Sequence, residues 1–96
     1  MKILAQNRLD DFAAKHADFA PAAGKWLASV KAARWRTPHD IKTMFRSADF
    51  LHNNRVIFNI KGNHYRIVVQ VRYSPAGAVL IEWVGTHAEY SRRKLN

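Results

Sequence analysis

Apolar residues in the first half of the chain recur every three or four positions, which is the spacing of amphipathic helices. Leu9, Phe12 and Ala13 follow this spacing, while charged residues fill the positions between them. The pattern predicts a helix over residues 6–16, and Asn7 is the candidate for its N-terminal cap because a short polar side chain can accept a backbone N–H bond.

Start signals predict two further helices. Asp18 followed by Pro21 favours a second helix that opens between these residues and runs to about Ala33. Thr37 and Pro38 form a cap followed by a first-turn proline, which predicts a short third helix. We expect this third helix to place three apolar side chains on one side: Ile41, Met44 and Phe45.

In the second half of the chain the apolar period changes to two, which is typical of β-strands. The alternation is clearest over residues 65–73, where apolar and aromatic side chains point one way and Arg66 and its even-numbered neighbours point the other. Flanking strands are predicted over residues 55–60 and 79–84. Trp83 alternates with Val79 and Ile81, so all three are expected to face the core.

These elements together predict an α+β fold. Residues 2–5 form a short candidate strand, and residues 86–94 a closing turn or short helix. Consecutive strands joined by short turns form antiparallel sheets that often have one covered face and one open face. We expect one domain over residues 1–96, with N-terminal helices packed on one face of a twisted antiparallel sheet.

Composition excludes several classes of protein. Hydrophobic residues make up 48% of the 96 residues, enough for a small core, and the lack of cysteine excludes disulfide scaffolds and thiolate metal sites. The five histidines do not form a zinc-binding pattern, so we expect neither a metal nor a small-molecule cofactor. No apolar run approaches the roughly 20 residues that span a bilayer, and no signal peptide is apparent, so a cytoplasmic protein without a membrane partner is expected.

The net charge of +9, from 16 basic and 7 acidic residues, points to an anionic partner. Residues 51–80 contain no acidic side chain. The basic side chains of that stretch are Arg55, Lys61, Arg66 and Arg72. If Arg66 and Arg72 face solvent, pairing brings Arg55 and Asn59 beside them, which favours nucleic-acid binding. The alternative is a solvated sheet face on which arginine stems cover apolar neighbours.

His87 directly follows the last predicted strand, and two interpretations are open for it. An imidazole at a sheet edge is suited to giving or taking a proton at neutral pH, with Glu89 and Tyr90 nearby. The alternative, which spacing alone favours, is a helix start in which Thr86 is the cap and Glu89 returns to the backbone.

Three segments taken together resemble the HigB family of bacterial toxins. They are Trp-Arg-Thr-Pro-His-Asp-Ile-Lys at 35–42, Phe-Asn-Ile-Lys-Gly-Asn-His-Tyr-Arg-Ile-Val at 58–68 and Thr-His-Ala-Glu-Tyr at 86–90. The family belongs to the RelE-like group, which implies an endoribonuclease that cleaves mRNA, generally on the ribosome, and so inhibits translation. It also implies neutralisation by a cognate helix-turn-helix antitoxin of the HigA type.

The resemblance also implies catalytic residues. At the matching positions they are His87, Arg66, Lys61, Glu89 and Tyr90. His87 would act as general acid or base, and Glu89 would position it or accept a proton. Arg66, helped by Lys61, would stabilise charge on the phosphoryl oxygens, and Tyr90 would stack on or orient a nucleotide.

The same resemblance, together with the charge pattern, gives RNA-binding candidates. They are Arg55, Asn63, His64, Arg72, Arg92 and Arg93. Ser91 departs from the family, which most often has Asp after Thr-His-Ala-Glu-Tyr. Two other functions stay open: a toxin of the same fold that acts on DNA gyrase, and a non-catalytic RNA- or ribosome-binding module.

Overall fold

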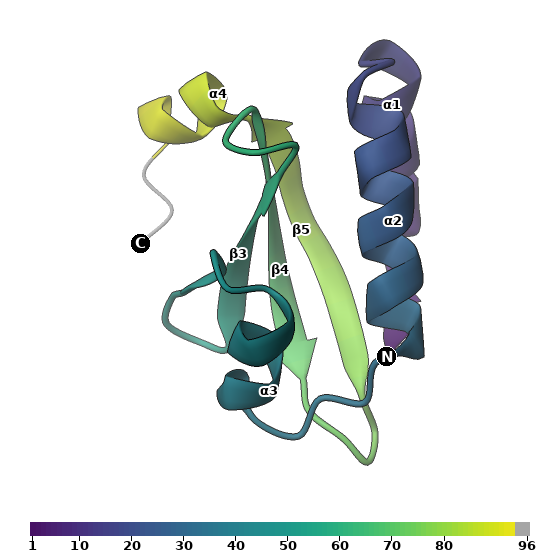
Figure 1. Ribbon diagram of the computed structural model, residues 1–96, viewed down its shortest axis with the longest axis vertical. Coiled ribbons are helices and arrows are strands. Elements are labelled where there is room, and N and C mark those ends of the chain that lie inside the picture. The colour runs from purple at the N-terminus through teal and green to yellow at the C-terminus, as the bar shows by residue number, and fades with distance from the viewer. Residues whose placement is uncertain (94–96) are drawn as a thin grey trace.

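A five-stranded sheet in the order β1-β5-β4-β3-β2 forms the centre of the protein. The computed structural model describes residues 1–93. Its elements are β1 (Lys2–Leu4), α1 (Gln6–Lys15), α2 (Phe19–Ala32), α3 (Pro38–Met44), β2 (Asp49–Phe50), β3 (Arg55–Ile60), β4 (Tyr65–Arg72), β5 (Ala78–Thr86) and α4 (His87–Arg92). Figure 1 shows α1 and α2 overlapping along one side of the sheet and α4 at its upper end.

The α+β prediction is confirmed, but the sheet differs from the antiparallel one predicted in the direction of one strand, β1. Strands β2 to β5 pair antiparallel, whereas β1 pairs with β5 in parallel, so the sheet is mixed. The parallel pairing is possible because α1 and α2 separate β1 from the rest of the sheet along the chain. Strand β2 was not predicted, since two residues are too few to show an alternation.

The helix-start signals were partly right. Thr37 caps α3 as predicted, and Asp40 completes a capping box with it. Asn7 is not a cap, because α1 begins one residue earlier, after Ala5 in the left-handed conformation. Of the three apolar residues predicted to share one side of α3, Ile41 is buried and Phe45 packs against the core, whereas Met44 is 50% exposed.

The core lies between the helices and one face of the sheet, and Phe58 is at its centre. The Phe58 ring contacts three other aromatic rings, those of Trp26, Trp35 and Phe45, with centroid distances of 5.3, 6.1 and 5.0 Å. Phe58 and both tryptophans are buried. This aromatic group fixes α2 and the start of α3 on the sheet.

An irregularity in the β4–β5 pairing changes the expected face of Trp83. Val69 pairs with Ile81 and Val68 with Trp83, so Glu82 is an extra residue in β5. Beyond such a bulge the alternation of β5 is shifted by one position. Ile81 faces the core as predicted, but the prediction for Trp83 was wrong: its side chain lies on the other face.

Asp18 connects the start of α2 to the sheet. Its side chain does not cap the helix. Instead, Tyr65 Oη–H donates to Asp18 Oδ1 at 2.6 Å and Lys61 Nζ donates to Asp18 Oδ2 at 3.0 Å. The hydrogen bond from Tyr65, then that from Lys61, lowers the pKa of Asp18 to about 2, and the same Tyr65 bond raises the pKa of Tyr65.

We therefore expect acid to weaken this connection. A carboxyl whose pKa is lower in the folded state, about 2 against an ordinary 3.8, stabilises the fold above pH 4. That stability is lost as the pH falls from about 4 to about 2. Asp18→Asn should lower the free energy of unfolding at neutral pH and flatten its decline below pH 4, as measured by urea denaturation. Asp10→Asn, an exposed change in α1, is the control; equal behaviour of the two variants would contradict the prediction.

Candidate functional site

The sheet face turned away from α1 and α2, called the open face below, is a layered surface. Ile57 and Val68 pair with each other on this face and are nevertheless only 3% and 1% exposed. Longer side chains of the neighbouring positions therefore lie over an apolar layer, as the alternative interpretation of the sequence held for arginine stems. At the β1 edge the open face is aliphatic as well, since Leu4, which is 36% exposed, pairs there with Leu80.

Arg66 is held by two neighbours on the open face. Its cross-strand partner is Asn59, as predicted, and Arg66 Nε–H donates to Asn59 Oδ1 at 3.1 Å. The Arg66 guanidinium carbon also lies 4.7 Å from the ring centroid of Tyr90 in α4, within the range of a cation–π contact. The bond to Asn59 uses one of five N–H donors, so the fork keeps donors for an anionic ligand.

Trp83 and Arg93 extend this group, which we call the Arg66–Tyr90 cluster: Arg66, Tyr90, Trp83 and Arg93. The Trp83 and Tyr90 ring centroids are 5.8 Å apart, and the Arg93 guanidinium carbon lies 5.0 Å from the Trp83 ring. Sequence reasoning missed Trp83 because strict alternation assigns it to the core. The sequence carries no signal of the bulge, because Glu82 between Ile81 and Trp83 fits a regular alternating strand.

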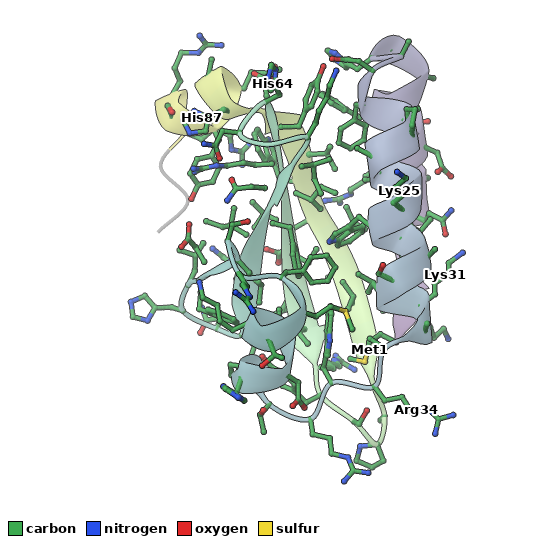
Figure 2. All side chains as sticks on the ribbon, viewed as in Figure 1. Met1, Lys25, Lys31, Arg34, His64 and His87 are labelled. Atoms are coloured by element: carbon green, nitrogen blue, oxygen red, sulfur yellow. The ribbon has the colours of Figure 1, made fainter. Side chains whose placement is uncertain are left out.

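His87 is the first residue of α4 and is half-buried. It precedes Tyr90 of the cluster by three residues in the chain. Its backbone N–H donates to the carbonyl of His64, in the turn between β3 and β4, at 3.0 Å. Gly85, two residues earlier, pairs with Arg66, so β5 delivers His87 to the end of the sheet that carries Arg66. In Figure 2, His64 and His87 lie at one end of the molecule, and Arg34 lies at the other.

Residues 86–89 form the helix start that spacing favoured. Thr86 N–H donates to Glu89 Oε1 at 2.7 Å, and Glu89 N–H donates to Thr86 Oγ1 at 3.1 Å. The Thr86 N–H bond is the main reason that the pKa of Glu89 is lowered, with Arg92 and His16 adding smaller contributions. Glu89 is thus ionised and engaged in holding the first turn of α4, which carries His87.

Lys61 is not brought to the Arg66–Tyr90 cluster. Its ammonium forms the ion pair with Asp18 on the helix side of the sheet. The family motif around Lys61 could not reveal this partner, because Asp18 lies 43 residues away in the sequence and outside the motif. The backbone of Lys61 does contribute to the site region, since its carbonyl accepts from His64 N–H at 3.3 Å in the same turn.

The RNA-binding candidates divide between the two ends of the sheet. Asn63 and His64 are exposed in the β3–β4 turn, whose His64 carbonyl accepts a hydrogen bond from His87 N–H. Arg92 and Arg93 are exposed at the end of α4, the helix that His87 begins. Arg72 lies at the far end of β4, six positions from Arg66 or roughly 20 Å along an extended strand.

Arg55 differs from the expectation of an acid-free basic surface. Its side chain forms an ion pair with Glu82, with Nε and Oε1 at 3.2 Å. The bulge explains the difference. Glu82 and Trp83 together oppose the single residue Val68 of β4, so both can lie on the open face, where Glu82 reaches Arg55. The cross-strand partner of Arg55 is Gln70, two positions before Arg72 in β4.

The described part of the chain, residues 1–93, brings no three histidine and acidic side chains together as a metal site. Within the same residues, no helix is long and apolar enough to cross a membrane.

Gly85 is predicted to be required for the packing of Trp83. A Cβ atom at Gly85 would lie 2.5 Å from two carbons of the Trp83 ring, so the ring would have to move, which would alter its contact with Tyr90. We expect Gly85→Ala to cost about 1–3 kcal/mol in urea denaturation and to change the near-UV circular dichroism. Gly24→Ala is the matched control, since a Cβ there meets no atom within 4 Å. Equal stabilities of the two variants would contradict the prediction.

Comparison with known proteins gives one finding. A family model described as HigB_toxin, RelE-like toxic component of a toxin-antitoxin system, matches residues 20–93. No curated protein matches the chain. The matched segment contains α2 from its second residue, α3, α4 and all of the sheet except β1, and therefore includes Arg66, His87 and Tyr90. The chain belongs to the HigB family of RelE-like toxins, the toxic components of toxin-antitoxin systems, and its partner is an antitoxin.

Proposed function

We propose that this toxin is an endoribonuclease that cleaves mRNA on the ribosome and thereby inhibits translation. One observation carries the proposal: the Arg66 guanidinium is held between Asn59 and the Tyr90 ring, at the end of the sheet where His87 begins α4. A pre-oriented guanidinium and an imidazole carried at the same end of the sheet would supply the two groups that phosphodiester cleavage needs most. The antitoxin is proposed to be of the HigA type.

The proposed reaction uses the RNA's own 2′-hydroxyl as nucleophile. Its oxygen attacks the adjacent phosphorus, the bond from phosphorus to the 5′-oxygen breaks, and the products are a 2′,3′-cyclic phosphate and a free 5′-hydroxyl. A base must take the 2′-hydroxyl proton, an acid must give a proton to the leaving oxygen, and a cation must stabilise the phosphoryl oxygens.

His87 is proposed as the general acid or base. The His64 carbonyl and the Thr86–Glu89 cap fix the backbone on both sides of His87, so its imidazole starts from a defined position. We assign Glu89 a positioning role through this cap. Lys61 is proposed to brace the β3–β4 turn through Asp18 rather than to contact the phosphate.

Arg66 is proposed to bind the phosphoryl oxygens, with its guanidinium oriented by two neighbouring side chains. The Tyr90 ring covers one face of the guanidinium, and Asn59 fixes its rotation. The opposite face of a guanidinium plane can stack on an RNA base, which would place the scissile phosphate beside the remaining N–H donors. Arg93 over Trp83, together with the exposed Arg92, would bind neighbouring phosphates.

Asn63 and His64 are proposed to contact a nucleotide next to the scissile phosphate. Both are exposed in the turn that holds α4, and an imidazole ring can stack on an unpaired base. Arg55 and Arg72 are proposed to contribute affinity along the open face.

His87→Ala should lower the rate of RNA cleavage by about 10²-fold or more, because proton transfer by a positioned side chain contributes at least that much. The measurement is cleavage of ribosome-bound mRNA with mapping of new 5′-hydroxyl ends. His52→Ala, an exposed histidine in the β2–β3 turn, is the matched control and should cleave at the wild-type rate. Wild-type cleavage by His87→Ala would overturn the catalytic role of His87.

Arg66→Lys separates catalysis from binding. Lysine keeps the charge but loses the fork and the bond to Asn59, so cleavage should fall by about 10²-fold while RNA affinity changes little. Cleavage rate and affinity for a non-cleavable RNA are measured on the same protein. Growth arrest by the wild-type protein without any new 5′-hydroxyl ends would contradict the endoribonuclease proposal.

A further inference from the structure

A concave surface of about 460 Å³ lies at the end of the sheet opposite His87. Its walls come from the start of β1, the segment between α2 and α3, and the turn between β4 and β5. We call it the distal pocket. Figure 2 shows Met1 and Arg34, two of its lining residues, far from His64 and His87.

The distal pocket is cationic. Lys2, Arg34 and Arg36 line it, and none of its lining residues is acidic. All three side chains are exposed, and neither ion pair within residues 1–93 includes any of them. Ser74 adds a hydroxyl group to the same lining. Three cations around one concavity repel each other, and an anion in the pocket would relieve that repulsion. The carboxylate of Asp40 lies next to Arg36, whose backbone N–H donates to it at 2.8 Å, but Asp40 does not line the pocket.

The nearby end of α2 does not oppose an anion as strongly as a free helix C-terminus would. The last carbonyls of a helix carry partial negative charge. Here the N-terminal ammonium of Met1 donates hydrogen bonds to the carbonyls of Val30, Lys31 and Ala33, at 3.2, 3.1 and 2.6 Å. These carbonyls are therefore occupied on the side that faces the start of β1.

Lys2 connects the pocket to the open face. In the sheet, Ala78 pairs with Lys2 on one side and with Arg72 on the other, so the two cations flank Ala78 on one face. Arg72 and Arg66 lie on the same face of β4, roughly 20 Å apart along the strand. Basic side chains thus lead from the Arg66–Tyr90 cluster along the open face to the distal pocket.

We propose that the distal pocket binds a backbone phosphate of the same RNA whose scissile phosphate lies at Arg66. That the ligand is RNA rests on the function proposed above. Guanidinium forks match the paired oxygens of a phosphodiester, and a polynucleotide supplies phosphates at both ends of the open face at once. The pocket would give affinity for long RNA without base preference, since phosphate contacts carry no sequence information.

The test is the salt dependence of RNA binding. A 15-nucleotide 2′-O-methyl RNA, which cannot be cleaved by 2′-hydroxyl attack, is titrated at several NaCl concentrations. For the triple variant Lys2→Gln, Arg34→Gln, Arg36→Gln, the slope of log affinity against log salt should become less steep by about 2, from three contacts at about 0.7 each. A dinucleotide, with one phosphate, should bind this variant and the wild type at Arg66 with equal affinity.

A second triple variant controls for net charge. Lys15→Gln, Lys25→Gln, Arg46→Gln removes the same charge from exposed positions outside the pocket and should keep the wild-type slope. Circular dichroism checks that both variants are folded. Equal losses of slope in the two variants would overturn the proposal, because diffuse charge would then explain the binding. An unchanged slope with weakened antitoxin binding would also overturn it, by assigning the pocket to the protein partner.

These outcomes are separate from those of the proposed function. The binding measurement does not depend on cleavage, so a protein that fails to cleave mRNA can still show the pocket-dependent slope. Conversely, cleavage that needs His87, together with an unaltered slope in the Lys2, Arg34 and Arg36 variant, would leave the enzyme proposal standing and remove the distal pocket.

Discussion

The extra residue of β5 determines what the open face of the sheet can carry. Because Glu82 interrupts the pairing with β4, Trp83 moves from the core face to the open face. Glu82 meets Arg55 there, and the Trp83 ring occupies the space above Gly85 and beside Tyr90. A regular strand would have buried Trp83 with Ile81 and left Tyr90 without its aromatic neighbour. The cluster around Arg66 is thus a consequence of one local change in register.

The rest of the site depends on short-range bonds at the same end of the sheet. Asp18 holds Lys61 and Tyr65 at the two ends of the β3–β4 turn, and the carbonyl of His64 in that turn holds His87. None of these contacts needs a metal or a long loop. They join α2, the turn and α4 into one connected structure, so the position of His87 depends on residues from widely separated parts of the chain.

Much of the fold could be predicted because its signals are local. The alternation of β4 and the caps at Thr37 and Thr86 each depend on neighbours a few residues away. Trp83 could not be predicted, since a bulge breaks the period that the prediction assumes. Of the candidate site residues, Arg66, Tyr90 and His87 lie at one end of the sheet, but Lys61 has a partner across the fold that spacing does not reveal.

The bond between His87 and His64 joins two main-chain groups, a property with an evolutionary consequence. Since neither side chain takes part, substitutions at both positions leave the attachment of α4 to the turn intact. The chemistry displayed at residues 64 and 87 is therefore free to diverge without loss of the scaffold. Toxins of this architecture could exchange one proton-transfer residue for another, or lose activity altogether, and still present the same folded surface to an inhibitor.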